Sequence, residues 1–190
     1  MSTEARVTTL ELAMTELAVA QARTQANLDR LAERSEREMA ELRRQHGELS
    51  NKFGTLVEDI VFPGIPEVFR RVFGQDKRPE CALRVTRRHV RDPGRMQEFD
   101  AIAEGDAIFL INETKSRVRA EDVSAFAFLL SETVSFFPHA EGKRSVGALA
   151  SFHIDPSVVR AGEREGLLML GLSSGLMEIL NSPDFTPKAF

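Results

Sequence analysis

The chain has 190 residues, enough for one domain and an extension, and 42% of them are hydrophobic, as is usual for globular proteins. No apolar run approaches the about 20 residues of a membrane-spanning helix, and the N-terminus lacks the basic and apolar segments of a signal peptide. The single cysteine, Cys81, excludes an internal disulfide and fits a reducing compartment. We therefore expect a cytoplasmic protein with no membrane partner.

Residues 3–50 predict one long helix, because they contain no proline, a single glycine and mostly strong helix formers. The helix is expected to continue to Val61, before Pro63. Apolar residues recur at heptad spacing as far as Leu31 and resume at Met39 after a four-residue insertion. This pattern is typical of a coiled coil with a stutter.

The apolar stripe on this helix is narrow and includes polar residues such as Gln21 and Thr24. Such a stripe is not stable alone in water. We expect residues 1–52 to form a coiled-coil stalk that joins copies of the chain into a homo-oligomer through residues 3–52. The alternative is a helix that folds back on its own domain.

Residues 53–190 predict an α/β domain with a mixed sheet flanked by helices. A short helix at 65–73 is followed by three strands in an antiparallel meander. A helix at 120–137 then crosses over to a strand parallel to the third. The strands are expected at 82–91, 97–103, 107–113, 145–154 and 167–172, and further helices at 156–163 and 176–181.

Charged residues gather at the ends of the second and third predicted strands. Glu113 and Lys115 are two residues apart and therefore share a face of the third strand. Asp100 can project beside them from the second strand if residues 104–106 form a hairpin turn. Two carboxylates and an ammonium are costly to hold together, and a divalent cation would stabilise them. The alternative is a simple ion pair between Glu113 and Lys115, because E-x-K often arises by chance.

These residue types suit a magnesium site. Mg²⁺ prefers oxygen ligands and keeps several waters. Asp100 and Glu113 would supply carboxylates, and the carbonyl of Thr114 would supply a third oxygen. Lys115 would stabilise charge during attack on a phosphate. Glu58 points away from the apolar stripe of the long helix, so it either completes the metal shell or is a solvent-exposed helix glutamate.

A basic segment precedes the site-bearing strands. Residues 70–95 hold nine lysines or arginines and three acids, which gives this segment a charge of +6 on a chain of −4. A basic patch beside an acidic pocket suits a polyanion held by its phosphates. The alternative is a solvated surface with an uneven charge pattern. The phosphate contacts are expected from Arg84, Arg87, Arg88 and Arg91.

The segments 98–103 (EFDAIA) and 108–115 (IFLINETK) together resemble the core motif of the PD-(D/E)XK nuclease superfamily, which has the restriction-endonuclease-like fold. The α-β-β-β-α-β core of that family matches the elements expected over residues 53–154. The resemblance implies that Asp100 and Glu113 bind Mg²⁺ or Mn²⁺. It also implies that Lys115 assists the attacking water and that Glu58 contributes. A coiled coil joined to such a domain is similar to the arrangement of some prokaryotic proteins.

We therefore expect a metal-dependent endonuclease that hydrolyses phosphodiester bonds. Duplex DNA is the expected substrate, because the chain has no Trp or Tyr on which single-stranded bases could stack. One alternative is a catalytically inactive nuclease-like scaffold or nucleic-acid-binding module, oligomerised by its coiled coil. Others are a different metal-dependent hydrolase and an interaction subunit of a larger defence or repair system.

Overall fold

The computed structural model describes residues 3–74, 78–173 and 176–190. The chain divides into two compact units, Met1–Ser50 and Asn51–Phe190. Helix α1 (Thr3–Val61) makes up the first unit and contributes its last turns to the second. The predicted end of this helix before Pro63 is confirmed. None of the helices described has both the length and the apolar composition needed to cross a membrane.

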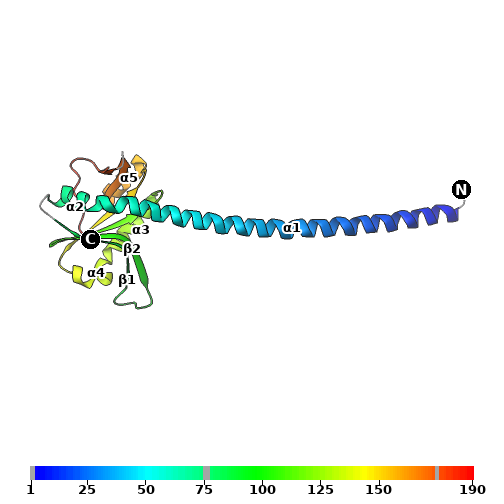
Figure 1. Ribbon diagram of the computed structural model, residues 1–190, viewed down its shortest axis with the longest axis horizontal. Helices are drawn as coiled ribbons and strands as arrows, with labels where there is room; N and C mark the ends of the chain where they lie inside the picture. Colours follow the sequence, from blue (N-terminus) through cyan, green and yellow to red (C-terminus); the bar gives the residue numbers. More distant parts are fainter. Residues whose placement is uncertain (1–2, 75–77, 174–175) are drawn as a thin grey trace. The chain divides into compact units, whose positions relative to one another are not determined.

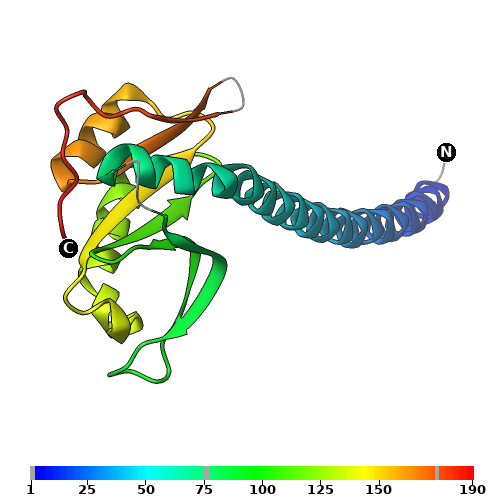
Figure 2. The same cartoon turned by 60° about the vertical axis from the view of Figure 1, so that its left-hand side comes forward.

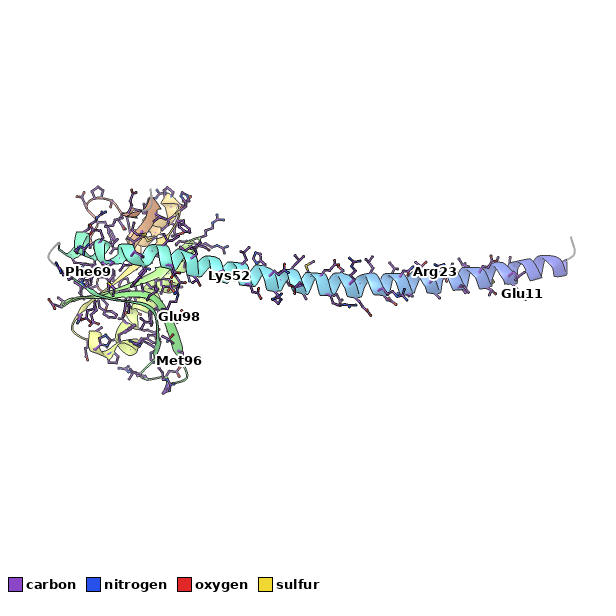
Figure 3. The ribbon with its side chains drawn as sticks, viewed as in Figure 1. Glu11, Arg23, Lys52, Phe69, Met96 and Glu98 are labelled. Carbon is purple, nitrogen blue, oxygen red and sulfur yellow. The ribbon has the colours of Figure 1, made fainter. Side chains whose placement is uncertain are left out.

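In the first unit, the side chains described along α1 are exposed. Leu10, Leu17, Leu28 and Leu31 of the predicted seam are all more than half exposed, and Figure 3 shows side chains standing off the helix between Glu11 and Arg23. Ion pairs such as that between Arg34 and Glu38 support the helix locally, by a few tenths of a kcal/mol each. A single copy therefore leaves the apolar stripe of this unit in water.

The second unit is built on a six-stranded sheet with the strands in chain order, β1 to β6. Figure 1 labels the first two strands, β1 and β2. The first three strands form the predicted antiparallel meander, β3 and β4 are parallel as predicted, and β5 is parallel to β4. The observed α/β architecture is that of the predicted fold class. The strands are β1 (Glu80–Arg88), β2 (Met96–Glu104), β3 (Ile108–Thr114), β4 (Arg144–Ser151), β5 (Leu168–Ser173) and β6 (Leu176–Ile179).

One face of the sheet is covered by the end of α1 and by α2 (Ile65–Phe73) (Figure 2). Val61 and Phe69 are buried there in one cluster with Leu110 of β3. Gly74 ends α2 at φ 129°, a backbone conformation that glycine adopts without strain. This packing brings the last turns of α1 to the strands that carry the predicted site.

The opposite face is covered by α3, α4 and α5, with a second buried cluster that includes Phe126 and Leu149. The rings of Phe99 and Phe137 meet edge to face in this cluster, with their centroids 4.8 Å apart. The sheet is therefore buried on both faces at its centre. The helices are α3 (Ala120–Ser131), α4 (Thr133–Phe136) and α5 (Pro156–Glu165), with 3₁₀ turns η1 (Phe62–Gly64) and η2 (Pro138–Ala140).

The prediction of one continuous helix over 120–137 was wrong, because the helix breaks at Glu132. The backbone of Glu132 has φ −101° and ψ 9°, outside the helical region. Its carboxylate accepts hydrogen bonds of 2.9 and 2.6 Å from Arg95 in the β1–β2 connection. The ion pair with a distant residue accompanies the change of direction, which buries both Phe136 and Phe137.

The prediction of a helix over 176–181 was also wrong, because this segment contains strand β6. Its backbone pairs with β5, with Met177 opposite Leu172 and Glu178 opposite Gly171. Met177 packs in the cluster under α2, whereas Leu180 packs in the cluster on the other face. Pairing with a distant strand decides the conformation of this short segment.

Candidate active site

The predicted carboxylates lie where β2 and β3 run side by side. The register pairs Ala101 with Asn112, so one further step places Asp100 across from Glu113. Beyond Glu113, the backbone N–H of Lys115 donates to the carbonyl of Ala150 on β4, at 2.9 Å. Hydrogen bonds of the sheet thus fix the backbone on both sides of the site.

Asp100 is the most perturbed acid of this site. Its Oδ2 accepts a 2.6 Å hydrogen bond from the backbone N–H of Thr114. Burial, reinforced by the negative charges of Glu113 and Glu58, raises the pKa of Asp100 to about 7, and the Thr114 hydrogen bond and Lys115 only partly oppose this. A positive charge placed beside Asp100 would therefore stabilise its ionised form.

Glu113 and Lys115 form an ion pair. The Nζ of Lys115 donates to Oε1 of Glu113 at 2.6 Å, and the two side chains are 42% and 16% exposed, respectively. Burial is the largest single influence and acts to lower the pKa of Lys115. The hydrogen bond to Glu113 and the nearby negative charges together outweigh burial, so the pKa lies above its ordinary value. The sequence alone allowed an isolated ion pair at the end of a strand. This pair is not isolated, because the charges of Glu113 and Lys115 both act on the pKa of Asp100.

Thr114 can offer the site only its backbone. Its side chain is buried, and its Oγ1 accepts a 2.8 Å hydrogen bond from Nδ2 of Asn112. Asn112 is 1% exposed, and its Oδ1 lacks a hydrogen-bond partner among the described residues. Asn112 was missed by the sequence reasoning, although a polar residue that ends an apolar run just before Glu113 is a usable signal.

The side chain of Glu58 is mostly buried rather than exposed to solvent, and its charge acts on Asp100. Its side chain is 18% exposed, and its Oε2 accepts a 2.8 Å hydrogen bond from Nε of Arg84. The same guanidinium donates to Oδ1 of Asp59 at 2.6 Å and to the carbonyl of Thr55 at 3.3 Å. We call Arg84, Glu58 and Asp59 the Arg84 cluster. It ties β1 to the last turns of α1, and its charge on Glu58 reaches Asp100.

Arg84 stands in an unusual place for this role. In the β1–β2 register it lies between the pairs of Leu83 and Val85, which puts it across from Asp100. With φ 51° it is the one non-glycine residue of the described chain with a positive φ. Such a backbone costs of order 1 kcal/mol or more and persists where surrounding contacts hold it. The guanidinium is therefore engaged by the acids of α1, and its predicted contact with a phosphate stays a prediction.

The other predicted phosphate contacts lie on the surface of β1 and the turn after it. Arg87, Arg88 and Arg91 are exposed. Arg87 donates to the carbonyl of Thr86 at 3.1 Å and lies over the ring of Phe137 at 5.5 Å. Their role in nucleic-acid binding likewise stays a prediction.

The donor set fits a hard divalent cation that keeps most of its waters. Asp100 and Glu113 offer carboxylates, and Mg²⁺ is commonly bound through one or two of them. Among the residues that the structure describes, however, no three His, Cys, Asp or Glu side chains form a group that could hold a metal. Glu58 is held by Arg84 instead. The arrangement thus fits a two-carboxylate site better than the three-carboxylate shell that included Glu58.

Comparison with known proteins gives little further information. No family model matches the chain, and no curated protein matches it. Among solved structures, it is similar to the crystal structure of a repair endonuclease from Pyrococcus abyssi, with 17% identity and a TM-score of 0.40. That match covers 58% of this chain and 46% of the other, so less than half of the endonuclease is represented. At this level of similarity we assign the chain to no family.

Proposed function

We propose that the second unit is a metal-dependent nuclease that hydrolyses phosphodiester bonds in duplex DNA. The observation that carries this proposal is the pair of Asp100 and Glu113 beside Lys115. The raised pKa of Asp100 marks a place where a cation would stabilise charge that the protein alone holds poorly. The E-T-K sequence at the end of β3 and the meander that precedes it support the same reading.

Each side chain would have a separate task. Asp100 and Glu113, with the carbonyl of Thr114, would hold Mg²⁺ or Mn²⁺, which lowers the pKa of a bound water and neutralises phosphate charge. Lys115 keeps its ammonium despite burial, because the hydrogen bond to Glu113 and the nearby negative charges together raise its pKa. It would stabilise the negative charge that develops on the phosphate. Glu58, held by Arg84, would add negative potential around the metal site rather than a direct ligand.

The first unit would supply self-association. The exposed apolar stripe of α1 suits burial against other copies of the same helix, through residues 3–52. Duplex DNA would contact the exposed arginines of β1 and of the turn after it, namely Arg87, Arg88 and Arg91.

A non-catalytic nucleic-acid-binding scaffold is the second candidate. The observation in its favour is the Arg84 cluster, in which the guanidinium engages Glu58 and so removes a third carboxylate from the possible metal ligands. A scaffold needs neither metal binding nor the ammonium of Lys115. Metal binding and cleavage therefore separate the two proposals.

The first test is calorimetric titration with Mn²⁺ of the wild type, Asp100→Asn and Lys115→Ala, followed by incubation of each with supercoiled plasmid. Asp100→Asn should lose the heat of Mn²⁺ binding, and Lys115→Ala should keep it. Both should lose nicking activity, by about 100-fold or more. Glu98→Gln, which changes an exposed carboxylate on the same strand (Figure 3), is the control that should leave binding and nicking unchanged. Absence of Mn²⁺ binding in the wild type would favour the scaffold.

A further inference from the structure

A recess of about 690 Å³ opens where the segments after β3 and β4 meet, and residues from 116–120 and 153–158 line it. Because β3 and β4 are parallel, both segments leave the sheet at the same edge. The hydroxyl of Ser151 donates to the carbonyl of Ser116 at 3.2 Å, which joins the two walls. The recess therefore begins one residue beyond Lys115.

The lining of the recess is rich in nitrogen donors. Arg117, Arg119 and His153 line it and are exposed. Arg117 has no ion pair with any residue that the structure describes. Arg119 lies 3.2 Å from Glu121, but these side chains are 68% and 73% exposed, and such a pair is held only weakly. Both guanidiniums are therefore available to an anion.

One acid, Asp155, also lines the recess, but its charge is engaged locally. Its Oδ1 accepts hydrogen bonds from the backbone N–H and the hydroxyl of Ser157, at 2.7 and 2.5 Å. These bonds cap the start of α5 and lower the pKa of Asp155. An anion would therefore bind on the side of the recess formed by Arg117 and Arg119.

We propose that this recess binds a phosphate group of a nucleotide unit through Arg117 and Arg119, with Ser116 and His153 as further hydrogen-bonding groups. Guanidinium forks match phosphate oxygens in pairs, which favours this ligand over a single carboxylate. The volume lies within the range of about 300–1,000 Å³ that is usual for small-ligand sites, so it admits more than a bare phosphate.

The inference deepens the proposed function and rests on it in one respect. If the second unit cleaves DNA, the bound group is a backbone phosphate adjoining the one attacked at Asp100 and Glu113. The bound DNA strand would then run along the edge of the sheet past Lys115. The basic segment 70–95 is less suited to this task than its charge suggests, because Arg84 and Arg95 are already paired with acids.

The test compares Arg117→Ala and Arg119→Ala with Arg164→Ala, a control that removes an exposed arginine from the last turn of α5, outside the recess. Duplex affinity is measured by fluorescence anisotropy without divalent metal, over a series of salt concentrations. Each recess variant should bind duplex about tenfold more weakly, with a salt slope smaller by about 1, and Arg164→Ala should match the wild type.

A second arm identifies the source of the phosphate. Deoxyadenosine monophosphate is titrated by calorimetry into the wild type, Arg117→Ala, Arg119→Ala and Arg164→Ala. If the recess variants bind duplex more weakly and the wild type binds no monophosphate, the recess holds a DNA strand. If Arg117→Ala loses monophosphate binding but keeps its duplex affinity, the recess holds a free nucleotide. If both recess variants match Arg164→Ala with both ligands, the inference is overturned.

These measurements test the phosphate site independently of the nuclease proposal. The phosphate measurements need no metal, and Arg117→Ala should bind Mn²⁺ as the wild type does. A wild type that binds no Mn²⁺ but loses duplex affinity through Arg117→Ala would retain the phosphate site and reject the metal-dependent nuclease.

Discussion

At the scale of single residues, ionisation of the Asp100 carboxyl costs free energy in the folded protein. It is buried near the negative charge of Glu113, with one backbone N–H from Thr114 as its direct hydrogen bond. A carboxylate so placed is stabilised as the neutral acid or by a cation. The same environment that would make it useful to a metal site therefore makes it a source of instability at neutral pH.

This cost predicts a pH dependence of stability. The pKa of Asp100 rises from an ordinary 3.8 to about 7 on folding, so the folded state binds more protons between these values. The free energy of unfolding should therefore fall as pH rises through this window, by up to about 4 kcal/mol. Asp100→Asn removes the titration, keeps an acceptor for Thr114, and should gain stability relative to the wild type between about pH 5 and about pH 8.

Urea unfolding of both proteins at the same chain concentration, across this pH range, measures the difference. Addition of Mn²⁺ at about pH 8 should stabilise the wild type and leave Asp100→Asn unchanged. Parallel stability curves for the two proteins would show that Asp100 titrates at an ordinary pKa.

The sequence predicted which carboxylates meet, because the two-residue period of strands and the hairpin between them are local properties. Asp100, Glu113 and Lys115 follow from that alternation. The Arg84 cluster was not predictable in this way, because it joins residues about 25 positions apart through the packing of α1 on the sheet. Nor was the positive φ of Arg84, a residue with no glycine-like freedom to signal it.

At the scale of elements, β4 is the central strand against which α3 packs. Its residues from Ser145 to Ser151 are all buried, and small side chains at 147, 148 and 150 let the neighbouring layers approach. Gly147 is the one glycine among these positions. A Cβ there would meet the side chain of Leu130 on α3 and lie 2.8 Å from Cδ2 of Leu167.

Gly147→Ala should therefore destabilise the second unit by about 1–3 kcal/mol, because α3 would have to move or repack. Gly54→Ala is the matched control, since nothing lies within 4 Å of a Cβ at this helical position. It should be neutral or stabilise by up to about 1 kcal/mol. Urea unfolding midpoints test both, and an unchanged midpoint for Gly147→Ala would mean that α3 shifts at no cost.

The meander and the β3–β4 crossover were predictable because alternation and helix periodicity specify them over long segments. The two errors share a physical cause. The break at Glu132 accompanies an ion pair with Arg95, and the conformation of β6 is set by pairing with β5. Short segments with weak local preference take the structure that their distant partners impose.

At the scale of the whole molecule, the first unit has no buried core among its described side chains, and its stripe has the spacing of a coiled coil. Isolated helices of this kind gain most of their stability from packing against others. The state of association therefore decides whether this unit is folded in solution.

Deletion of residues 1–48 should convert an oligomer to a smaller species, measured as molar mass by light scattering. Leu28→Glu, on the stripe, should weaken association in the full chain, because each copy would place a charge in the seam. Ala26→Glu, on the exposed side away from the stripe, should not. If the intact and shortened proteins contain the same number of chains per particle, this helix does not join copies.

The Arg84 cluster also has a consequence for how the sequence can change over evolution. Loss of Arg84 alone would leave Glu58 and Asp59 uncompensated beside an acid that already resists ionisation. Loss of either acid alone would weaken the contacts that hold the backbone of Arg84 at its positive φ. We therefore expect these three positions to covary among homologues, with substitutions tolerated in combination more often than singly.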